Sequence, residues 1–349
     1  MTLPKTTRAA ILVEQRKPLE VAEIGLPASL APGQVLVRLL TSGICGSQIG
    51  EIDGAKGEDR FLPHLLGHEG CGIVEEIGPA VSHVVPGDKV VLHWRKGPGI
   101  EAATPAYAWN GRKVNAGWVT TFNAHAVISE NRLTPVPADT DPEIAALFGC
   151  AVTTGFGVVV NNARLTIGES VVVFGAGGIG LNIVQAASLV SAHPVIAVDL
   201  YDAKLDLAKA MGATHTINAR TQDAEAEIRR IVGPAGPDVF IDNTGQPKII
   251  EMGYALVKPE GRVILVGVPK KGSTVNLYSL PLHFGKVLTG SHGGETMPER
   301  DIPRYLALFR AGRLPLKSLI TERFALDDIN RAIEGMRSGR IAGRCMIRF

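Results

Sequence analysis

The chain has 349 residues, enough for about two domains at roughly 150 residues each, and its 45% hydrophobic and 20% charged residues are an ordinary globular balance. A formal net charge of +2 gives no reason to expect a nucleic acid or an anionic membrane as a partner. The four cysteines are widely separated, which argues against a disulfide scaffold and favours a reducing, cytoplasmic location. The first twenty residues lack an apolar core of signal-peptide length, and no apolar run predicts a membrane span.

The first 150 or so residues are predicted to form a β-rich domain. Short segments with strand character are separated by Pro/Gly turns such as Ala31-Pro32-Gly33 and Val85-Pro86-Gly87-Asp88. These segments read AAILV, QVLVRLL, GCGIVEEIG and KVVLHW. Regular short strands with such turns indicate a barrel-like β domain.

From about Thr153 the pattern changes to alternating strands and helices, which is typical of an α/β fold with a parallel sheet. The predicted strands contain VVVF, VIAVDL, THTINA, DVFIDN and RVILVGV. The last 55 or so residues return to mixed elements and end in a strand, RCMIRF. We therefore expect a discontinuous catalytic domain, residues 1–152 and 294–349, with a dinucleotide-binding domain, residues 153–293, inserted in it.

A glycine-rich motif follows the first strand of the inserted domain and opens an apolar helix, which is the context that a dinucleotide-binding loop requires. Its residues are Gly175, Ala176, Gly177, Gly178, Ile179 and Gly180. Gly175 permits the tight turn, Gly177 lets a pyrophosphate approach the backbone, and Gly180 allows the helix to pack closely on the strand. The helix N-terminus favours the phosphate charge.

An acidic residue ends the second strand of this predicted unit. Asp199 closes VIAVDL, where a carboxylate accepts hydrogen bonds from ribose hydroxyls and repels a 2′-phosphate. Lys204 follows within reach of the same ribose. The sequence therefore favours NAD over NADP.

Three residues in the β-rich part form a candidate metal set. A catalytic zinc takes three protein ligands of nitrogen or sulfur type and keeps one position open. Cys45, His68 and Cys150 supply two thiolates and one imidazole, each beside a glycine. Bound to them, zinc would polarise an alcohol oxygen.

In combination these motifs resemble the zinc-dependent medium-chain dehydrogenase/reductase family of alcohol dehydrogenase type. The matching segments, spread over essentially the whole chain, are Gly43-Ile44-Cys45-Gly46-Ser47, Gly67-His68-Glu69-Gly70-Cys71-Gly72, Gly87-Asp88, Gly149-Cys150, Thr153-Thr154-Gly155 and the glycine-rich loop. The resemblance implies a GroES-like β-rich catalytic domain and a Rossmann domain with a doubly wound parallel sheet. It also implies an enzyme that transfers hydride between an alcohol and NAD.

The same resemblance implies roles for single residues. Cys45, His68 and Cys150 would bind one catalytic zinc. Glu69 would lie beside the ion, and Ser47 would hydrogen-bond the substrate hydroxyl and pass its proton on. The cofactor-binding residues would include Gly267 and Val268 near the nicotinamide and Arg344 at the pyrophosphate.

The chain departs from the family in three places, one in the lobe that usually binds a structural zinc and two beside the catalytic zinc ligand Cys45. Many relatives carry a structural zinc on a lobe with four cysteines, whereas the corresponding Arg95–Asn115 has none, so we expect a loop without zinc there. Gln48 stands where the family usually has an aspartate that orients the zinc histidine. Gly50 replaces a histidine of the proton relay, and the sequence does not identify the group that takes the proton from Ser47.

The substrate stays open from sequence alone. Pocket candidates, chosen by their position beside the motifs, are Trp94, Trp118 and Phe122. A polyol or sugar-like alcohol stays a candidate substrate beside simple alcohols and glutathione adducts. It is suggested by polar and charged residues between positions 58 and 95, namely Glu58, Asp59, Arg60, His93 and Arg95.

Two other functions remain as alternatives. One is a zinc-free NAD(P)H reductase of the same superfamily, and the other is a non-catalytic dinucleotide-binding protein. Neither needs the three zinc ligands together. Relatives in the family are dimers or tetramers built through edge strands of the dinucleotide domain, so a homodimer or homotetramer is expected.

Overall fold

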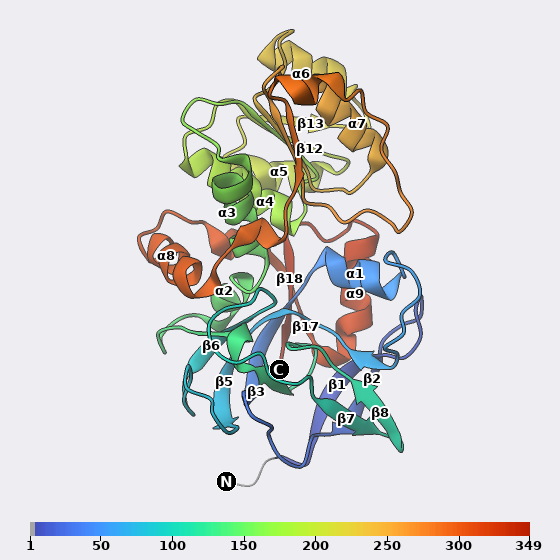
Figure 1. Cartoon of the computed structure of the whole chain (residues 1–349), viewed down its shortest axis with the longest axis vertical. Coiled ribbons are helices and arrows are strands. Elements are labelled where there is room, and N and C mark those ends of the chain that lie inside the picture. Colours follow the sequence, from blue (N-terminus) through green and yellow to red (C-terminus); the bar gives the residue numbers. More distant parts are fainter. Residues whose placement is uncertain (1–3) are drawn as a thin grey trace. The chain divides into compact units, whose positions relative to one another are not determined.

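The computed structural model describes residues 4–349, which divide into two units (Figure 1). The first unit comprises the residues up to Cys150 together with Met297–Phe349, and the second comprises Ala151–Thr296. The first unit is therefore discontinuous in sequence. Within residues 4–349, no helix combines the length and the apolar character needed to cross a bilayer.

The first unit consists of a closed barrel and a larger mixed sheet with a few helices. The barrel has the strand order β1 (Thr6–Leu12), β2 (Glu20–Gly25), β7 (Ala106–Trp109), β8 (Arg112–Asn115) and β4 (His64–Leu65). The sheet has the order β10 (Leu133–Pro135), β6 (Lys89–His93), β5 (Glu69–Ile77), β3 (Gln34–Ile44), β18 (Arg344–Arg348) and β17 (Ile320–Ala325), with β9 (His125–Ser129) also paired to β3. The helices are α1 (Gly46–Ile52), α2 (Pro142–Leu147), α8 (Pro298–Arg310) and α9 (Ile329–Arg337).

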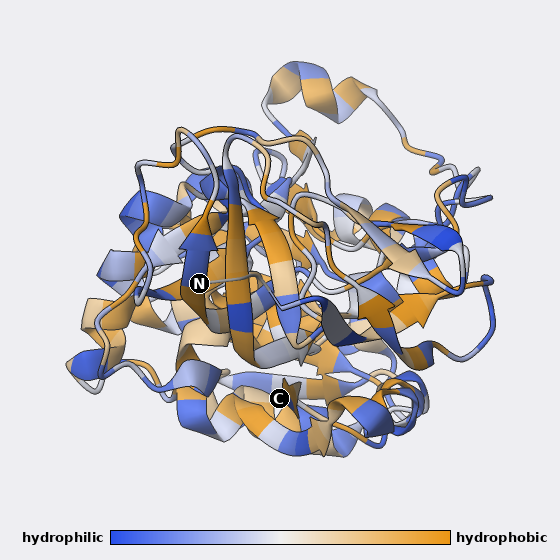
Figure 2. Ribbon diagram, turned by 90° about the horizontal axis from the view of Figure 1, so that it is seen from below, coloured by the Kyte–Doolittle hydropathy of each residue, from blue (hydrophilic) through white to orange (hydrophobic). Residues whose placement is uncertain are grey.

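Strand β3 is the centre of the mixed sheet. It pairs with β5, β9 and β18, and nearly all of its eleven residues are buried. Val35, Val37 and Leu39 on this strand pack in one apolar cluster with residues of β5, β6 and β9. In Figure 2, hydrophobic residues occupy much of the strands near the centre of the view. Because β3 ends at Ile44, this packing fixes the position at which the next residue, Cys45, leaves the sheet.

The segment Arg95–Asn115, expected to be a loop, contains a β-hairpin. Its strands β7 and β8 pair in antiparallel fashion and join the barrel. Asn110 and Gly111 both have positive φ at the turn, as a two-residue hairpin turn requires. The Asn-Gly pair between AYAW and RKVN is the sequence signal that predicts this hairpin.

The second unit is a parallel sheet of six strands with helices between them, as the alternating pattern predicts. Its order is β13 (His215–Asn218), β12 (Val195–Asp199), β11 (Val171–Phe174), β14 (Val239–Asp242), β15 (Arg262–Leu265) and β16 (Val287–Gly290). The helices are α3 (Ala151–Gly157), α4 (Gly178–Leu189), α5 (Asp202–Ala210), α6 (Ala224–Val232) and α7 (Pro247–Leu256).

The central and edge strands of this sheet differ in burial. Every residue of β11 and β12 is buried, which is why these strands read as continuous apolar runs in the sequence. The edge strand β16 is mostly exposed. Because β11 and β12 are parallel neighbours, their carboxyl ends place the glycine-rich loop and Asp199 at the same edge of the sheet, where ligands of such sheets bind.

Candidate metal centre and dinucleotide site

The three candidate zinc ligands come together in the first unit. The Sγ atoms of Cys45 and Cys150 and a ring nitrogen of His68 all lie within 4.8 Å of one another. Both cysteines are buried and His68 is partly buried. Two thiols and one imidazole at such distances are a donor set suited to a tetrahedral zinc with one open position.

Strand pairing explains how two of these residues meet. Cys45 follows the last residue of β3, and His68 precedes the first residue of β5. In the antiparallel register Ser42 lies opposite Gly70, so the end of one strand meets the start of the other. Residues that are distant in sequence are thus brought together by the sheet.

Cys150 reaches the same place because the residue before it has no side chain. A Cβ on Gly149 would lie 2.3 Å from the carbonyl oxygen of Leu92 and 2.8 Å from the Cα of Glu69. No larger residue fits at this distance without a backbone shift. Gly149 therefore allows the chain after α2 to pass against β5 and β6.

The cysteines differ in their protonation. The pKa of the Cys45 thiol lies well below its usual range because Cys150 hydrogen-bonds to it, and neighbouring His68 and Arg344 add to the effect against the opposing effect of burial. Burial raises the pKa of Cys71 and of Cys345 to about 12. Cys45 is thus prepared to act as a thiolate ligand, whereas Cys71 and Cys345 remain protonated structural residues.

Two buried polar atoms at this site have no hydrogen-bond partner among the described residues. They are Nε2 of His68 and the Oγ of Ser47. The other ring nitrogen of His68, Nδ1, lies 2.6 Å from the side-chain nitrogen of Gln48. A lone imidazole nitrogen near two cysteines fits a metal ligand, and a lone hydroxyl fits a group that awaits a substrate.

Glu69 and Arg344 form a buried ion pair beside the ligands. Glu69 is the first residue of β5 and Arg344 the first of β18, and β3 lies between these two strands. A Cβ on Gly43 of β3 would be 2.7 Å from the Glu69 carboxylate, so glycine leaves room for the pair. Both side chains are almost fully buried. A contact of Arg344 with a cofactor therefore stays a prediction.

The three aromatic pocket candidates differ in their surroundings. The Trp94 ring lies beside His68, with 6.5 Å between ring centroids. Trp118 is 43% exposed and lies under the guanidinium of Arg132. Phe122 belongs to an apolar core cluster and is 1% exposed. Among these three, Trp94 is the aromatic side chain placed next to the metal ligands.

Two of the polar residues that suggested a polyol pocket form hydrogen bonds with other residues of the protein. His93 is buried, and its nitrogens contact the Arg95 carbonyl at 2.7 Å and the Thr134 hydroxyl at 2.9 Å. Burial lowers the pKa of His93 to about 4, so the ring stays neutral. Asp59 contacts His64 at 2.7 Å. Neither side chain is left free to recognise a hydroxyl-rich substrate.

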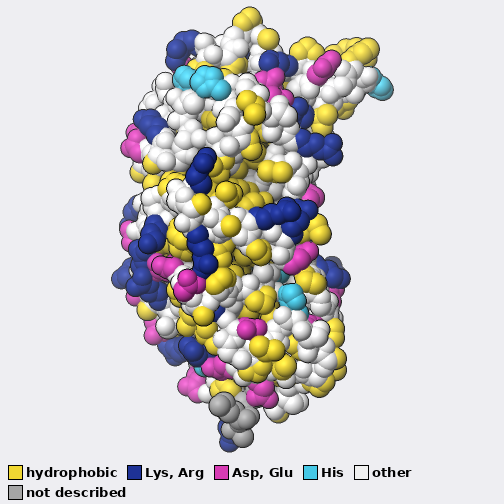
Figure 3. Space-filling view, turned by 90° about the vertical axis from the view of Figure 1, so that its left-hand side faces the viewer, with side chains coloured by type: hydrophobic (Ala, Val, Ile, Leu, Met, Phe, Trp, Pro, Cys, Tyr) yellow, Lys and Arg dark blue, Asp and Glu magenta, His cyan; other side chains and the backbone are white. Residues whose placement is uncertain are grey.

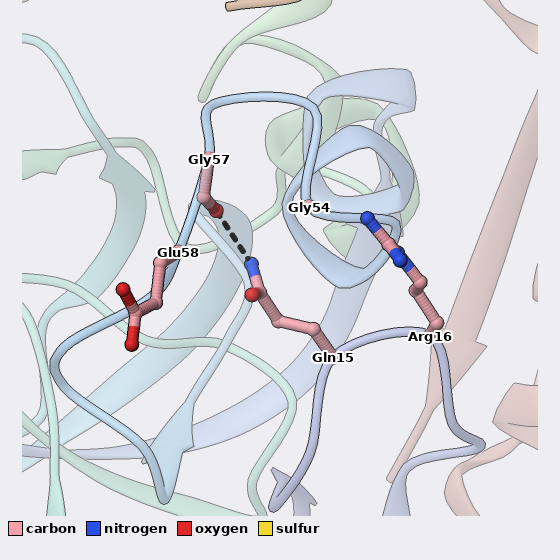
Figure 4. Close-up of a pocket in the computed structure, with 5 residues that line it drawn as sticks. All are labelled: Gln15, Arg16, Gly54, Gly57 and Glu58. Carbon is pink, nitrogen blue, oxygen red and sulfur yellow. Dashed lines mark hydrogen bonds between the residues drawn. The ribbon is translucent and has the colours of Figure 1, made fainter.

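His64, Asp59 and Glu51 form a second group of close polar side chains, with ligand atoms within 4.8 Å of one another. A shallow hollow of about 310 Å³ lies along the segment between Glu51 and Asp59 and is drawn in Figure 4. Gln15 spans part of it by donating a hydrogen bond of 3.0 Å to the carbonyl of Gly57. This hollow contains none of the predicted site residues.

The glycine-rich loop of the second unit has the geometry that a bound pyrophosphate needs. Gly175 has a φ of +100°, which permits the tight turn after β11. A Cβ on Gly180 would lie 1.9 Å from the carbonyl oxygen of Gly175, whereas a Cβ on Gly177 would meet open space. Gly177 is the N-cap of α4, and Gly178 and Ile179 begin the helix. The open side at Gly177 fits a ligand that approaches the helix N-terminus.

Asp199 is fixed against this loop at the end of β12. Its Oδ2 accepts a hydrogen bond of 2.8 Å from the backbone nitrogen of Ala176. Lys204 has its Nζ 3.8 Å from Oδ1 of the same carboxylate. Tyr201 has two cations over its ring, Lys204 at 4.9 Å and Arg220 at 4.8 Å. Arg220 was not identified from the sequence, because it lies in a different segment from the motif.

Two further predicted cofactor residues follow β15. A Cβ on Gly267 would lie 2.2 Å from the backbone nitrogen of Gly245, so this residue is held tightly against the loop after β14. Val268 is 59% exposed. An exposed apolar side chain beside a rigid glycine is consistent with the predicted place near a nicotinamide ring, which stays a prediction.

Comparison with known proteins agrees with this geometry. Residues 31–138 match the alcohol dehydrogenase GroES-like domain family, and residues 178–311 match the zinc-binding dehydrogenase family. The chain is 32% identical to S-(hydroxymethyl)glutathione dehydrogenase of Paracoccus denitrificans, with 95% of this chain and 97% of that protein covered. The chain belongs to the zinc-dependent medium-chain alcohol dehydrogenase family.

Solved structures of alcohol dehydrogenases have the same fold as this dehydrogenase. Benzyl alcohol dehydrogenase of Acinetobacter calcoaceticus has a TM-score of 0.89 and 30% identity, with 99% of this chain and 100% of that chain covered. An alcohol dehydrogenase zinc-binding domain protein of Burkholderia ambifaria has the same TM-score and 29% identity, with 99% of both chains covered. The expected GroES-like domain and mixed α/β fold are thus confirmed for this dehydrogenase.

Proposed function

We propose that this dehydrogenase uses one zinc ion per chain and NAD to interconvert an alcohol and its aldehyde or ketone. The observation that carries the proposal is the meeting of the ligand atoms of Cys45, His68 and Cys150 within 4.8 Å. The hydroxyl of Ser47, two residues after Cys45, adds to it because it is buried without a hydrogen-bond partner among the described residues. A metal that serves only the fold takes four protein ligands, whereas three leave a position for substrate.

Each site residue has a role in this reaction. The two thiolates and Nε2 of His68 would hold the ion. The Oγ of Ser47 would accept a hydrogen bond from the substrate hydroxyl and, as it takes that proton, pass its own hydroxyl proton on to water. When bound, zinc would polarise the alcohol oxygen and lower the pKa of its hydroxyl. Hydride transfer then requires the alcohol carbon and the nicotinamide to be held in contact.

The cofactor is proposed to be NAD because Asp199 ends β12 beside the glycine-rich loop, where an acidic residue of a dinucleotide-binding fold hydrogen-bonds the adenine ribose. Its carboxylate keeps accepting capacity for ribose hydroxyls and would repel a 2′-phosphate. Lys204 and Arg220 lie near enough to attract a phosphate instead. Initial rates with NAD⁺ and NADP⁺ decide between these effects: we expect NAD⁺ to be preferred and Asp199→Ala to reduce that preference at least tenfold. A wild-type preference for NADP⁺ would contradict the assignment.

The substrate is proposed to be an alcohol with a flat apolar group, such as an aromatic primary alcohol. Trp94 supports this, since its ring lies beside His68 and offers an apolar face. The relative from Acinetobacter calcoaceticus is named a benzyl alcohol dehydrogenase. The polyol hypothesis is weakened because the polar atoms of His93 and Asp59 already form hydrogen bonds with other residues of the protein.

The deciding experiment follows absorbance at 340 nm with NAD⁺ and a panel of benzyl alcohol, simple aliphatic alcohols, S-(hydroxymethyl)glutathione and polyols. We expect the highest kcat/KM for the aromatic alcohol, with Trp94→Ala lowering it by about 10-fold through KM, consistent with the loss of one aromatic contact. Rates confined to polyols would reverse the substrate proposal while leaving the reaction class intact.

Metal content separates this proposal from the two alternatives. A zinc-free reductase or a non-catalytic dinucleotide-binding protein would retain its properties after removal of zinc. The proposed enzyme would lose alcohol oxidation and regain it when zinc is added back. A chain that oxidises alcohols fully without metal would contradict the proposal.

We also propose a cytoplasmic homo-oligomer that forms through the edge strand β16. Among the described residues, none of the four cysteines is paired in a disulfide bond, and proteins of reducing compartments rarely contain structural disulfides. The chain before and along β16 exposes apolar side chains: Tyr278, then Leu280, Leu282 and Phe284 of the short 3-10 helix Leu280–Phe284, and Val287 of the strand itself. A sheet edge with unpaired backbone groups and neighbouring apolar side chains suits a second copy of the same edge. Sedimentation analysis should show a dimer or tetramer that Phe284→Glu weakens, and a wild-type monomer would contradict it.

The charge of the chain gives no reason to propose a different kind of partner. On the face shown in Figure 3, basic and acidic side chains lie among hydrophobic ones. The net charge of +2 is small for a chain of this length. A small-molecule alcohol or carbonyl compound is therefore the proposed partner of the site, with no role for nucleic acid or membrane.

A further inference from the structure

Gln48 lies between a backbone nitrogen and the zinc histidine. Its side-chain oxygen accepts a hydrogen bond of 2.8 Å from the backbone nitrogen of Cys45, which caps the N-terminus of α1. Its side-chain nitrogen lies 2.6 Å from Nδ1 of His68. Gln48 is 1% exposed, so water does not substitute for either contact.

The cap fixes which end of the amide faces the histidine. A backbone N–H only donates, so the amide oxygen must face Cys45. The amide nitrogen then faces His68, and because an amide nitrogen also only donates, Nδ1 must accept. A neutral imidazole that accepts at Nδ1 carries its single proton on Nε2.

Zinc binding requires the opposite arrangement. If Nε2 gives its lone pair to the metal, the proton of the ring must lie on Nδ1. Two donors, Nδ1–H and the amide NH₂ of Gln48, would then face each other. Turning the amide over only moves the conflict to the N–H of Cys45. A metal-binding histidine ordinarily donates from its second nitrogen to a carboxylate, a carbonyl or water.

We propose that Gln48 is a positioning residue that holds His68 in the tautomer unable to bind zinc through Nε2, and thereby weakens zinc binding. The proposal rests on the proposed function, since it takes Cys45, His68 and Cys150 as the zinc site. A carboxylate at position 48 accepts from Cys45 with one oxygen and from His68 with the other. Glutamate has nearly the shape of glutamine, so Gln48→Glu removes the conflict and keeps the helix cap.

The first experiment determines the tautomer directly in the metal-free protein. Histidines are labelled with ¹⁵N, long-range ¹H–¹⁵N correlations are recorded, and His68→Asn assigns the signal. We expect the His68 proton on Nε2 in the wild type and on Nδ1 in Gln48→Glu. A wild-type proton on Nδ1 would overturn the proposal, and this result needs no variant at position 48 to fold.

The second experiment measures the zinc dissociation constant by competition with a chelator. We expect Gln48→Glu to bind zinc about 10- to 100-fold more tightly than the wild type, the usual range for partners of a ligating histidine. Unchanged or weaker binding would overturn the proposal.

Gly46→Asp is the matched control for added negative charge. Gly46 is exposed in the first turn of the same helix, and a Cβ there meets open space, so an aspartate at this position adds a negative charge while Gln48 keeps both of its contacts. We expect less than a threefold change in zinc affinity. A gain equal to that of Gln48→Glu would show a charge effect and overturn the proposal. If neither the wild type nor any variant bound zinc, the proposed function would fail, while the tautomer measurement would still decide the role of Gln48.

Discussion

His64 and His68 lie four residues apart in the chain and have opposite surroundings. His64 has acceptors at both nitrogens, the Leu65 carbonyl at 2.9 Å and an Asp59 carboxylate oxygen at 2.7 Å. His68 contacts Gln48 through Nδ1 and leaves Nε2 without a partner among the described residues. Both histidines have other potential ligand residues nearby. The state of the ring nitrogens, and not the neighbouring residue types alone, distinguishes a structural histidine from a metal ligand.

The largest effect is expected at the ligand histidine. His68→Asn removes one of three zinc ligands, so bound zinc is lost and turnover falls by at least about 10³-fold, since a catalytic metal contributes several kcal/mol. Metal analysis and the 340 nm assay measure the two losses. Normal zinc content in this variant would show that His68 is not a zinc ligand.

Removal of the metal from the wild type tests the number of sites. A strong chelator should abolish alcohol oxidation, and added zinc should restore it at one ion per chain, because His64 has both ring nitrogens engaged. Cys45→Ser is the matched control and should bind little zinc. Two tightly bound ions per chain in the wild type would mean that Glu51, Asp59 and His64 also form a metal site.

A smaller effect, on stability alone, is expected at the structural histidine. His64→Asn leaves the partly buried carboxylate of Asp59 without its histidine partner and should lower the free energy of unfolding by about 1–3 kcal/mol. Denaturant unfolding measures this change, and zinc content should remain that of the wild type. Loss of zinc with unchanged stability would show that His64 is a metal ligand and not a structural histidine.

The smallest effect is expected for Glu51, which is partly exposed at the end of α1. Glu51→Gln keeps the size of the side chain and should change the free energy of unfolding by less than about 0.5 kcal/mol, as surface substitutions usually do. Parallel unfolding and zinc titrations of this variant provide the measurement. A change in zinc stoichiometry would contradict the view that this cluster is structural.

The sequence predicts the dinucleotide loop better than the metal centre for a physical reason. The residues Gly175–Gly180 form one turn, so their roles depend on local backbone geometry, which a short motif determines. Cys45, His68 and Cys150 meet only through strand pairing and the close approach at Gly149. From spacing alone the three could be unrelated, and the family resemblance was needed to join them.

Other features of the site could not be predicted from the sequence, because they depend on side-chain directions that no local sequence pattern determines. The double contact of Gln48 requires both the helix cap at Cys45 and the ring of His68. The burial of Arg344 against Glu69 follows from the order of three strands. The hairpin β7–β8 is different, since its Asn-Gly turn is visible in the sequence.

The central place of β3 has a consequence for how the catalytic centre is lost on heating. This strand pairs with β5 on one side and with β9 and β18 on the other, and it ends at Ile44, the residue before Cys45. Amide protons in such a strand exchange with solvent only through cooperative opening of the surrounding structure. The segment at the end of β3 that carries Cys45 should therefore not unfold by itself. The metal site and the sheet should unfold together as one cooperative unit. Thermal inactivation should then follow global denaturation closely.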